Sequence, residues 1–375
     1  MPSNQAAWLT AKGAPLSIEP APLLDPAPNQ ILIKNHAVAI NPVDWASQNM
    51  GQDLFPFLKF PCTLGLDAAG EVIAVGSAVT RVKVGDRVLG LASGSGRGNQ
   101  GAAFQEYTLL ADNLFSPIPD SISFEEASVI PLGLSTSACA IFQKDLLALP
   151  HPSVDPKPLG KTLLIWSGAS SVGCNAIQLG VAAGCDVITT CSPKNYELVR
   201  KLGASQAFDY NSGTVVSDIL TYLEDKTIAG AVGSMFYTHY PYRIEFPSIK
   251  TWVLTKKILT VGNVNAIRAG HGLNATKMVL EIVSKAKGNK FVAMAMRYEG
   301  PVPDGVESKF ILGSALADNE VGAAVYADYL PQALAEGKFI AAPEPLVVGK
   351  GLESIQKAFE VQMKGVSAKK VVVLL

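Results

Sequence analysis

The sequence predicts an α/β protein that combines a small barrel-like β domain with a doubly wound parallel sheet. Three observations predict this fold class. Closely spaced strand patterns with turn signals between them fill the first third of the chain. Strand and helix patterns then alternate, which is typical of βαβ units and a parallel sheet. The length of 375 residues suits two domains of ordinary size.

The first third of the chain predicts mainly β-structure. Strands are predicted over Ile31–Ala39, Ala69–Val75, Arg87–Leu91 and Phe104–Leu110. Turn signals separate them, notably Val84–Arg87 and the glycine-rich stretch Ser93–Gly101. Ser123 is predicted to cap a helix that opens at Phe124. Strands spaced this closely favour a small barrel-like domain.

From Leu163 onward, apolar strands alternate with helices. Strands are predicted over Leu163–Trp166, Val187–Thr190, Ala207–Asp209, Ile228–Val232, Lys290–Ala295 and Lys309–Gly313. Helices are predicted over Val172–Ala183, Lys194–Leu202, Val215–Leu223, Thr276–Lys287 and Glu320–Gly337. The tail predicts a strand, a helix and a strand over Leu346–Val348, Leu352–Lys364 and Lys369–Leu375. This alternation predicts the doubly wound sheet.

Composition excludes several function classes. Lys plus Arg number 31 and Asp plus Glu 32, so no basic excess suggests a nucleic-acid partner. The uncharged stretch Thr162–Cys185 contains glycines and polar residues that favour strand, turn and helix over a membrane span. Met1–Thr10 lacks the pattern of a signal peptide. Five cysteines without a C-x-x-C pair indicate free thiols, so a cytoplasmic protein is expected.

The strongest functional signal is the glycine loop Ser167–Gly173, which follows a predicted strand and opens a predicted helix. Glycine there lets the backbone approach a phosphate, and the helix N-terminus offers free N–H groups. The loop therefore predicts a dinucleotide site of the Rossmann type, with a purely structural tight turn as the alternative. Cys174 stands where a Walker A loop needs lysine, so ATP and GTP are not expected.

The end of the second predicted strand favours NADPH over NADH. Sites for NADH usually offer an acid there to the ribose 2′-hydroxyl. No carboxylate occurs in Thr189–Asn195, and Asp186 lies at the opposite end of the strand. Ser192, Lys194 and Asn195 instead offer donors to a 2′-phosphate. The alternative is that Ser192 caps a helix and Lys194 is merely solvated.

No metal site is predicted. The histidines His36, His151, His239 and His271 are scattered and lack paired ligand spacing. No G-x-S-x-G nucleophile elbow occurs. Tyr222 and Lys226 match the Y-x-x-x-K spacing of short-chain dehydrogenases, but they end a helix before the fourth strand, so we interpret the match as chance.

Four motifs occur in the order of a known family: Asn41–Asp44, Gly65–Val72, Val84–Val88 and the glycine loop. The chain resembles the medium-chain dehydrogenase/reductase superfamily over nearly its whole length. It is most similar to zinc-independent fungal members, the quinone-oxidoreductase-like proteins and the trans-acting enoyl reductases. The resemblance implies a GroES-like substrate domain over residues 1–130 and 340–375. It implies a Rossmann NADPH-binding domain over 131–339, with the active site in the cleft between them.

The resemblance also implies roles for individual residues. The cofactor phosphates would lie on the glycine loop, at Gly168, Ala169, Ser170, Ser171, Val172 and Gly173. The 2′-phosphate and adenosine would contact Ser192, Lys194, Asn195 and Tyr210. Thr136 would lie beside the nicotinamide as the catalytic residue, and Val43, Asp44 and Trp45 would line the cleft. Leu66 stands where zinc-dependent members have a ligating histidine, so no metal is expected.

The implied activity is hydride transfer from NADPH to an activated C=C bond, in an enone or enoyl thioester, or to a quinone. The partners expected are a small apolar electrophile and a biosynthetic pathway enzyme, for a monomer or homodimer without nucleic-acid or membrane partners. Two alternatives stay open: an NADPH-binding protein without turnover, and a zinc-type alcohol dehydrogenase in name only. Ala46 replaces a lysine that many relatives have after N-P-x-D-W, which leaves turnover itself open.

The segment Met235–Asn263 departs from its surroundings because it combines many aromatic and basic residues with a single acid. It forms an atypical insertion at about 233–263, just beyond the predicted strand Ile228–Val232. One hypothesis is a lid over the cleft that covers an apolar substrate. The other, which we favour, is an unspliced intron carried into the protein sequence.

Overall fold

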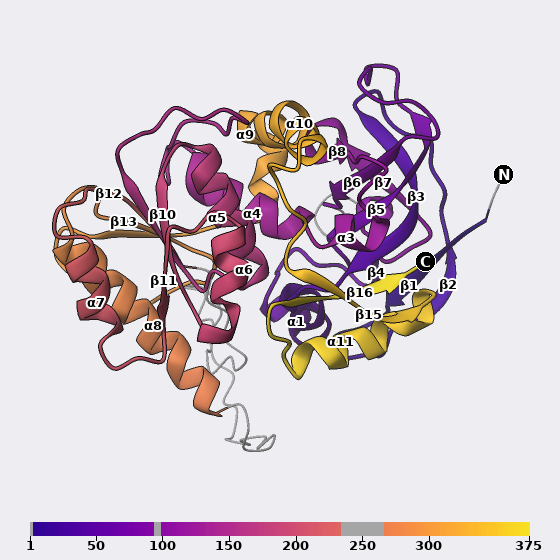
Figure 1. Cartoon of the computed structure of the whole chain (residues 1–375). Coiled ribbons are helices and arrows are strands. Elements are labelled where there is room, and N and C mark those ends of the chain that lie inside the picture. Colours follow the sequence, from indigo (N-terminus) through magenta and orange to yellow (C-terminus); the bar gives the residue numbers. More distant parts are fainter. Residues whose placement is uncertain (1–2, 94–98, 234–265) are drawn as a thin grey trace.

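A computed structural model describes residues 3–93, 99–233 and 266–375 (Figure 1). The segment Met235–Asn263, for which a lid and an unspliced intron are the two hypotheses, lies outside these residues, as does His239. Figure 1 shows the later strands and their helices on one side. The N-terminal strands lie on the other side, together with the C-terminal strands and the last helix.

The predicted doubly wound sheet is confirmed. Its six strands are all parallel to their neighbours, in the order β11 (Gln206–Asp209), β10 (Asp186–Cys191), β9 (Thr162–Trp166), β12 (Ile228–Gly233), β13 (Phe291–Met294) and β14 (Glu307–Phe310). Every residue of the central β9 and β12 is buried, as expected for strands covered on both faces. The order reverses between β9 and β12, and ligands of such sheets bind beyond the strand ends at that point.

The remaining strands form two sheets. The larger has the order β15 (Glu344–Lys350), β16 (Lys369–Leu374), β3 (Gln30–Ala39), β5 (Asp67–Val75), β6 (Arg87–Leu91) and β8 (Phe115–Pro117), and β7 (Tyr107–Ala111) also pairs with β3. The smaller has the order β2 (Ser17–Ala21), β1 (Asn4–Leu9) and β4 (Cys62–Thr63). The tail thus enters the same sheet as the first third of the chain, through antiparallel pairing of β16 with β3.

In chain order, the helices lie before and after β9. Those before the parallel sheet are α1 (Pro42–Met50), α3 (Phe124–Ser128) and α4 (Pro131–Phe142). Those that follow β9 are α5 (Ser171–Ala182), α6 (Tyr196–Lys201), α7 (Val215–Tyr222), α8 (Ala266–Lys285), α9 (Glu320–Ala323), α10 (Leu330–Ala335) and α11 (Ile355–Met363). Within the described part of the chain, no helix is both long and apolar enough to span a membrane.

Helix α4 joins the two parts. Every residue of α4 except Leu132 is buried, and the helix contacts both β6 and α5. One hydrophobic cluster accordingly continues from Leu89 on β6 through Leu134 on α4 to Ile177 on α5. A helix that is apolar on all sides shows no amphipathic period, which explains why the sequence patterns did not predict it.

Four predicted helices differ from the structure. The helix predicted over Thr276–Lys287 begins at Ala266, as α8, and the helix predicted over Leu352–Lys364 begins with a 3-10 turn, Leu352–Ser354. Pro193 begins a short 3-10 turn, Pro193–Asn195, so the helix predicted over Lys194–Leu202 begins only at Tyr196. The helix predicted over Glu320–Gly337 contains a π-helical segment, Ala324–Tyr329, between α9 and α10. The cap predicted at Ser123 is confirmed, since its hydroxyl accepts from the Glu126 N–H.

Candidate active site

The glycine loop turns sharply from β9 into α5. Ser167 adopts a positive φ of 68°. A Cβ on Gly173 would lie 2.2 Å from the Ser167 carbonyl oxygen, and a Cβ on Gly168 would lie 2.1 Å from Thr189 Oγ1. Only glycine fits at these two positions, because the turn packs directly onto the first turn of α5 and onto β10.

The N-terminus of α5 offers unpaired donors. The hydroxyl of the N-cap Ser170 accepts from the Gly173 N–H at 3.0 Å, and its carbonyl accepts from the Cys174 N–H at 2.8 Å. The N–H groups of Ser171 and Val172 bond to no described residue. Two donors without a described partner, at the positive end of a helix dipole, are the groups that an anionic phosphate prefers. This donor set fits a dinucleotide pyrophosphate.

The predicted 2′-phosphate residues lie beside this loop, at the ends of β10 and β11. The Ser192 hydroxyl, just after β10, lies 2.7 Å from the Tyr210 hydroxyl, just after β11. Asn195 donates its N–H to the Ser192 carbonyl at 2.9 Å, and Lys194 is exposed. The structure therefore brings these four residues together at one edge of the sheet, with a cationic side chain facing solvent.

Thr136 is distinguished from its two neighbours on α4. The Ser135 hydroxyl lies 2.7 Å from the Tyr326 hydroxyl, and the Ser137 hydroxyl shares its one proton between the carbonyls of Gly133 and Val172. The Thr136 hydroxyl bonds to none of the residues described, although only 8% of Thr136 is exposed. A threonine in a helix can usually bond to the carbonyl four residues earlier. Of three consecutive hydroxyls, this one keeps its hydrogen-bonding capacity for another group.

Thr136 also adjoins other elements of the candidate site. A Cβ on Gly313 would lie 2.7 Å from Thr136 Oγ1, so the 3-10 segment Gly313–Asp318 begins directly beside the hydroxyl. On the same helix, a Cβ on Gly133 would lie 2.7 Å from Ser171 Oγ. The absence of side chains at these glycines brings α4 close to both the end of the parallel sheet and the N-terminus of α5.

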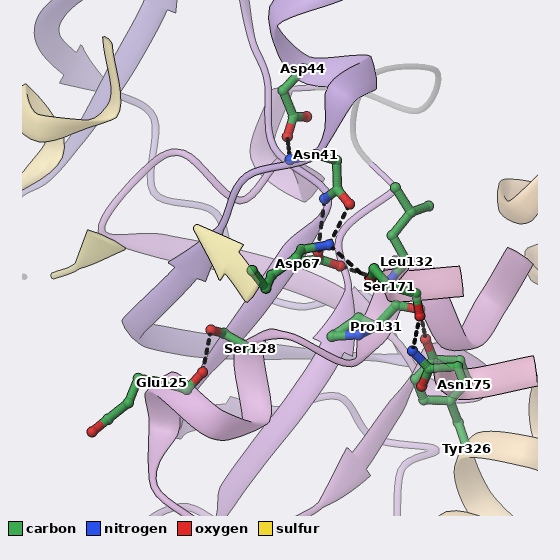
Figure 2. A network of polar contacts seen from close by, with 11 residues as sticks. Asn41, Asp44, Asp67, Glu125, Ser128, Pro131, Leu132, Ser171, Asn175 and Tyr326 are labelled. Carbon is green, nitrogen blue, oxygen red and sulfur yellow. Dashed lines mark hydrogen bonds and ion pairs between the residues drawn. The ribbon is translucent and has the colours of Figure 1, made fainter. Parts of the chain in front are cut away.

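A buried ionic network lies where the two parts of the molecule meet (Figure 2). Lys370 Nζ lies 2.9 Å from Asp67 Oδ2 and donates to Asn41 Oδ1 at 2.6 Å. Its third contact is Ser171 Oγ, on the first turn of α5, at 3.4 Å. Asp67 Oδ1 accepts from the Leu132 N–H at 2.6 Å, at the start of α4. The network therefore ties β5, β16 and α1 to α4 and α5.

The three residues predicted to line the cleft lie on or next to the first turn of α1. Asp44 Oδ2 accepts from the Asn41 N–H at 2.7 Å, so this buried carboxylate caps its own helix. Its burial raises the pKa of Asp44 to about 7. The Trp45 indole N–H donates to the Gln362 side chain on α11, and Val43 is half-buried. The polar groups of Asp44 and Trp45 thus contact the barrel-like part of the molecule.

The sequence patterns missed Asp67, Lys370 and Tyr326. A signal existed for the first two, because each is a charged residue beside a run of apolar residues at the start of a strand. Such a charge requires a partner if the strand is buried. No local signal identified Lys370 as the partner of Asp67, since the two lie near opposite ends of the chain.

Comparison with known proteins agrees with this arrangement. Residues 27–120 match the alcohol dehydrogenase GroES-like domain. The dehydrogenase orf1 of Aspergillus niger is 45% identical over 376 residues, covering 100% of both chains. The chain belongs to the medium-chain dehydrogenase/reductase superfamily. This oxidoreductase is also similar to two further fungal proteins, described below.

The trans-enoyl reductase himH of Aspergillus japonicus is 35% identical, covering 99% of this chain and 97% of its own. The zinc-binding alcohol dehydrogenase domain-containing protein cipB of Emericella nidulans is 43% identical, covering 100% and 98%. Among solved structures, the CurK enoyl reductase has a TM-score of 0.68 at 19% identity, covering 99% of both chains. This structural likeness supports the fold, and membership of the superfamily implies a nicotinamide cofactor.

Proposed function

We propose that this protein is an NADPH-dependent reductase that transfers hydride to an activated C=C bond, or to a quinone, without zinc. The observation that carries the proposal is the Thr136 hydroxyl, which bonds to none of the described residues and lies on a helix that packs against α5. A hydrogen-bond donor on this helix supports the proposal, because α4 packs beside a helix N-terminus that fits a dinucleotide. The substrate class is a small apolar electrophile: an enone, an enoyl thioester or a quinone.

The residues at the sheet edge support the choice of NADPH. The N–H groups of Ser171 and Val172, which bond to no described residue, would hold the pyrophosphate. Ser192, Lys194 and Tyr210 would hold the 2′-phosphate and adenosine, since hydroxyl and ammonium donors complement a phosphate. No acid occupies the position just after β10 where an NADH enzyme binds the ribose.

Thr136 supplies the chemistry expected of this chain. The reduced nicotinamide, when bound, supplies the hydride. Addition of hydride to the β-carbon leaves the electron pair of the C=C bond on the conjugated carbonyl oxygen, as an enolate. The Thr136 hydroxyl donates a hydrogen bond to that oxygen, and a proton from solvent then reaches the α-carbon. A positioned donor in a buried site stabilises such developing charge strongly.

The residues at the zinc position of the superfamily do not fit a metal. Leu66 has no ligand atom, and both oxygens of Asp67 are already occupied by the Asn41 side chain, the Leu132 N–H and Lys370. Among the residues described, no group of three or more His, Cys, Asp or Glu side chains could hold a metal ion. Elemental analysis of the purified protein tests this part of the proposal, and stoichiometric zinc would contradict it.

A second candidate function is NADPH binding without turnover. The observation that favours it is Ala46, buried at 2% exposure, where many superfamily members have a lysine. The Ala46 methyl group can neither donate a hydrogen bond nor move a proton. Under this candidate, the cofactor would bind normally and no electrophile would oxidise it.

One experiment distinguishes the two candidates. The purified protein is mixed anaerobically with NADPH and, in turn, an enone, a quinone and an enoyl thioester, and NADPH absorbance is followed. Simple saturated ketones serve as the control, since they lack a conjugated double bond. Oxidation by a conjugated substrate supports the reductase. Tight NADPH binding by calorimetry with no oxidation favours the second candidate.

A further inference from the structure

Tyr326 is a fully buried tyrosine in the π-helical segment Ala324–Tyr329. This segment interrupts what would otherwise be a continuous helix from α9 to α10. A π-helical turn widens the helix and re-aims the side chains within it, and such turns frequently occur at functional sites. Here the re-aimed side chain reaches the N-terminal part of α4, as Figure 2 shows for Tyr326 and Pro131.

The Tyr326 hydroxyl makes two hydrogen bonds to α4, and their directions follow from the chemistry. It donates its only proton to the Pro131 carbonyl, at 2.8 Å, because a carbonyl can only accept. It must therefore accept from the Ser135 hydroxyl, at 2.7 Å. The hydroxyl protons of Tyr326 and Ser135 are thus both used in these bonds. Pro131 and Ser135, one turn apart on α4, are both bonded to the Tyr326 hydroxyl oxygen.

This contact acts next to the candidate catalytic residue. Thr136 follows Ser135 directly, and its own hydroxyl has no hydrogen bond to a described residue to hold it in place. Asp67, on β5 in the barrel-like part of the molecule, accepts a hydrogen bond from the Leu132 N–H in the first turn of α4. The direction of the Thr136 hydroxyl therefore depends on how the first two turns of α4 are held.

We propose that Tyr326 is a positioning residue, whose hydroxyl holds α4 so that Thr136 donates to the reacting substrate. This inference rests on the proposed function of Thr136. The inference adds Tyr326, a residue of the π-helical segment that is fully buried and acts through α4. A displacement of about 1 Å at a reacting group can lower a rate about 100-fold, so loss of this hydroxyl has a measurable effect.

The test compares Tyr326→Phe with Tyr329→Phe. Tyr329 is also buried, at 4% exposure, in the same segment, and its hydroxyl bonds to no described residue, so it is the matched control. We expect kcat to fall about 10-fold in Tyr326→Phe, with the Kd for NADPH changed less than about 2-fold. Tyr329→Phe is expected to keep the kcat of the wild type.

A double-mutant cycle separates positioning from a general structural role. If Tyr326 acts through Thr136, Tyr326→Phe lowers kcat no further once Thr136→Val is present. If Tyr326→Phe does not fold, Ser135→Ala tests the same contact from the other side, because it removes the hydroxyl that bonds to Tyr326. We expect Ser135→Ala to lower kcat about 3-fold. Independent effects of Tyr326→Phe and Thr136→Val, or equal effects of the two tyrosine substitutions, would overturn the inference.

A readout without turnover keeps the inference separate from the proposed function. The fluorescence of bound NADPH reports the surroundings of the nicotinamide. We expect Tyr326→Phe and Thr136→Val to change it in the same way, and Tyr329→Phe to leave it unchanged. A wild-type protein that does not bind NADPH overturns the proposed function and this inference together. Normal binding with no change in Tyr326→Phe overturns this inference alone.

Discussion

Asp67 and Lys370 form an ion pair with a separation of 2.9 Å, in which 0% and 5% of the two side chains are exposed. The Asn41 side chain contacts both, since it donates to Asp67 Oδ2 at 2.7 Å and accepts from Lys370 at 2.6 Å. Buried charges are tolerated only when they are paired and hydrogen-bonded in this way. The pair therefore stabilises the junction of the two parts of the molecule only as long as both partners are present.

Removing one partner of this pair is expected to destabilise the protein strongly. Lys370→Met leaves the Asp67 carboxylate buried without its cation, and we expect a loss of about 3–5 kcal/mol in the free energy of unfolding. Lys369→Met is the matched control on the same strand, because Lys369 pairs with Glu344 at the surface. We expect it to change stability by less than about 1 kcal/mol. Urea unfolding of both variants measures the difference, and equal losses would contradict the prediction.

The raised pKa of Asp44 leads us to expect that the free energy of unfolding decreases as the pH rises from about 4 to about 7. Burial is the main cause that raises the pKa of Asp44 to about 7 from a usual value of 3.8; the Asn41 N–H opposes the shift and the charge on Asp67 adds to it. The folded state therefore holds this proton more tightly than the unfolded state does. The contribution of Asp44 to stability is present below pH 3.8 and is lost as the pH rises to about 7.

Asp44→Asn removes this titration. We expect its free energy of unfolding, relative to the wild type, to improve by roughly 2–4 kcal/mol between pH 4 and pH 8. Urea unfolding across this range measures the effect. Asp25→Asn, at an exposed position, is the control and should follow the wild-type curve. Parallel curves for Asp44→Asn and the wild type would show that Asp44 does not titrate in this range.

Substitution of Thr136 is expected to lower turnover without weakening the binding of NADPH. Thr136→Val keeps the shape of the side chain and removes the hydroxyl, so we expect kcat to fall about 10- to 100-fold, with the Kd for NADPH unchanged. Thr136→Ser restores the hydroxyl and should recover most of the activity. Steady-state kinetics with an enone substrate gives both values. Full activity in Thr136→Val would assign Thr136 a packing role only.

Ser192 and Lys194 predict a preference for NADPH. A charge-assisted hydrogen bond contributes about 1.5–3 kcal/mol, so we expect NADPH to bind about 10- to 1,000-fold more tightly than NADH. The double variant Ser192→Ala/Lys194→Ala should lose most of this preference by weakening NADPH binding alone. Calorimetry with both cofactors measures it. Equal dissociation constants in the wild type would reject the assignment of these residues to a 2′-phosphate.

The glycine loop is expected to tolerate no side chain at position 173. A Cβ there would lie 2.2 Å from the Ser167 carbonyl oxygen, which belongs to the backbone and cannot rotate away. We expect Gly173→Ala to lower stability by about 1–3 kcal/mol and to weaken NADPH binding at least about 10-fold. Gly213→Ala is the control, since nothing lies within 4 Å of a Cβ there. Normal binding by Gly173→Ala would show that the loop adjusts its backbone freely.

Local patterns were sufficient to predict much of the fold. Leu163–Trp166 and Ile228–Val232 are short apolar runs bounded by turns, and both are buried central strands. The glycine loop was recognisable because a dinucleotide-binding turn needs glycine at fixed distances within one stretch of chain. Helix α4 was not predicted, because it is buried on every side and no amphipathic period remains in its sequence.

Local sequence patterns were sufficient for the strand and helix alternation, the turn from β9 into α5, and the residues at the end of β10. These features depend on neighbours within a few residues, so composition and spacing reveal them. Other relationships became visible only in the folded chain: Lys370 pairs with Asp67, Tyr326 bonds to α4, and Thr136 alone among three hydroxyls lacks a partner among the described residues. Those relationships join residues from distant parts of the chain. They arise because burying each polar group requires a partner that only packing supplies.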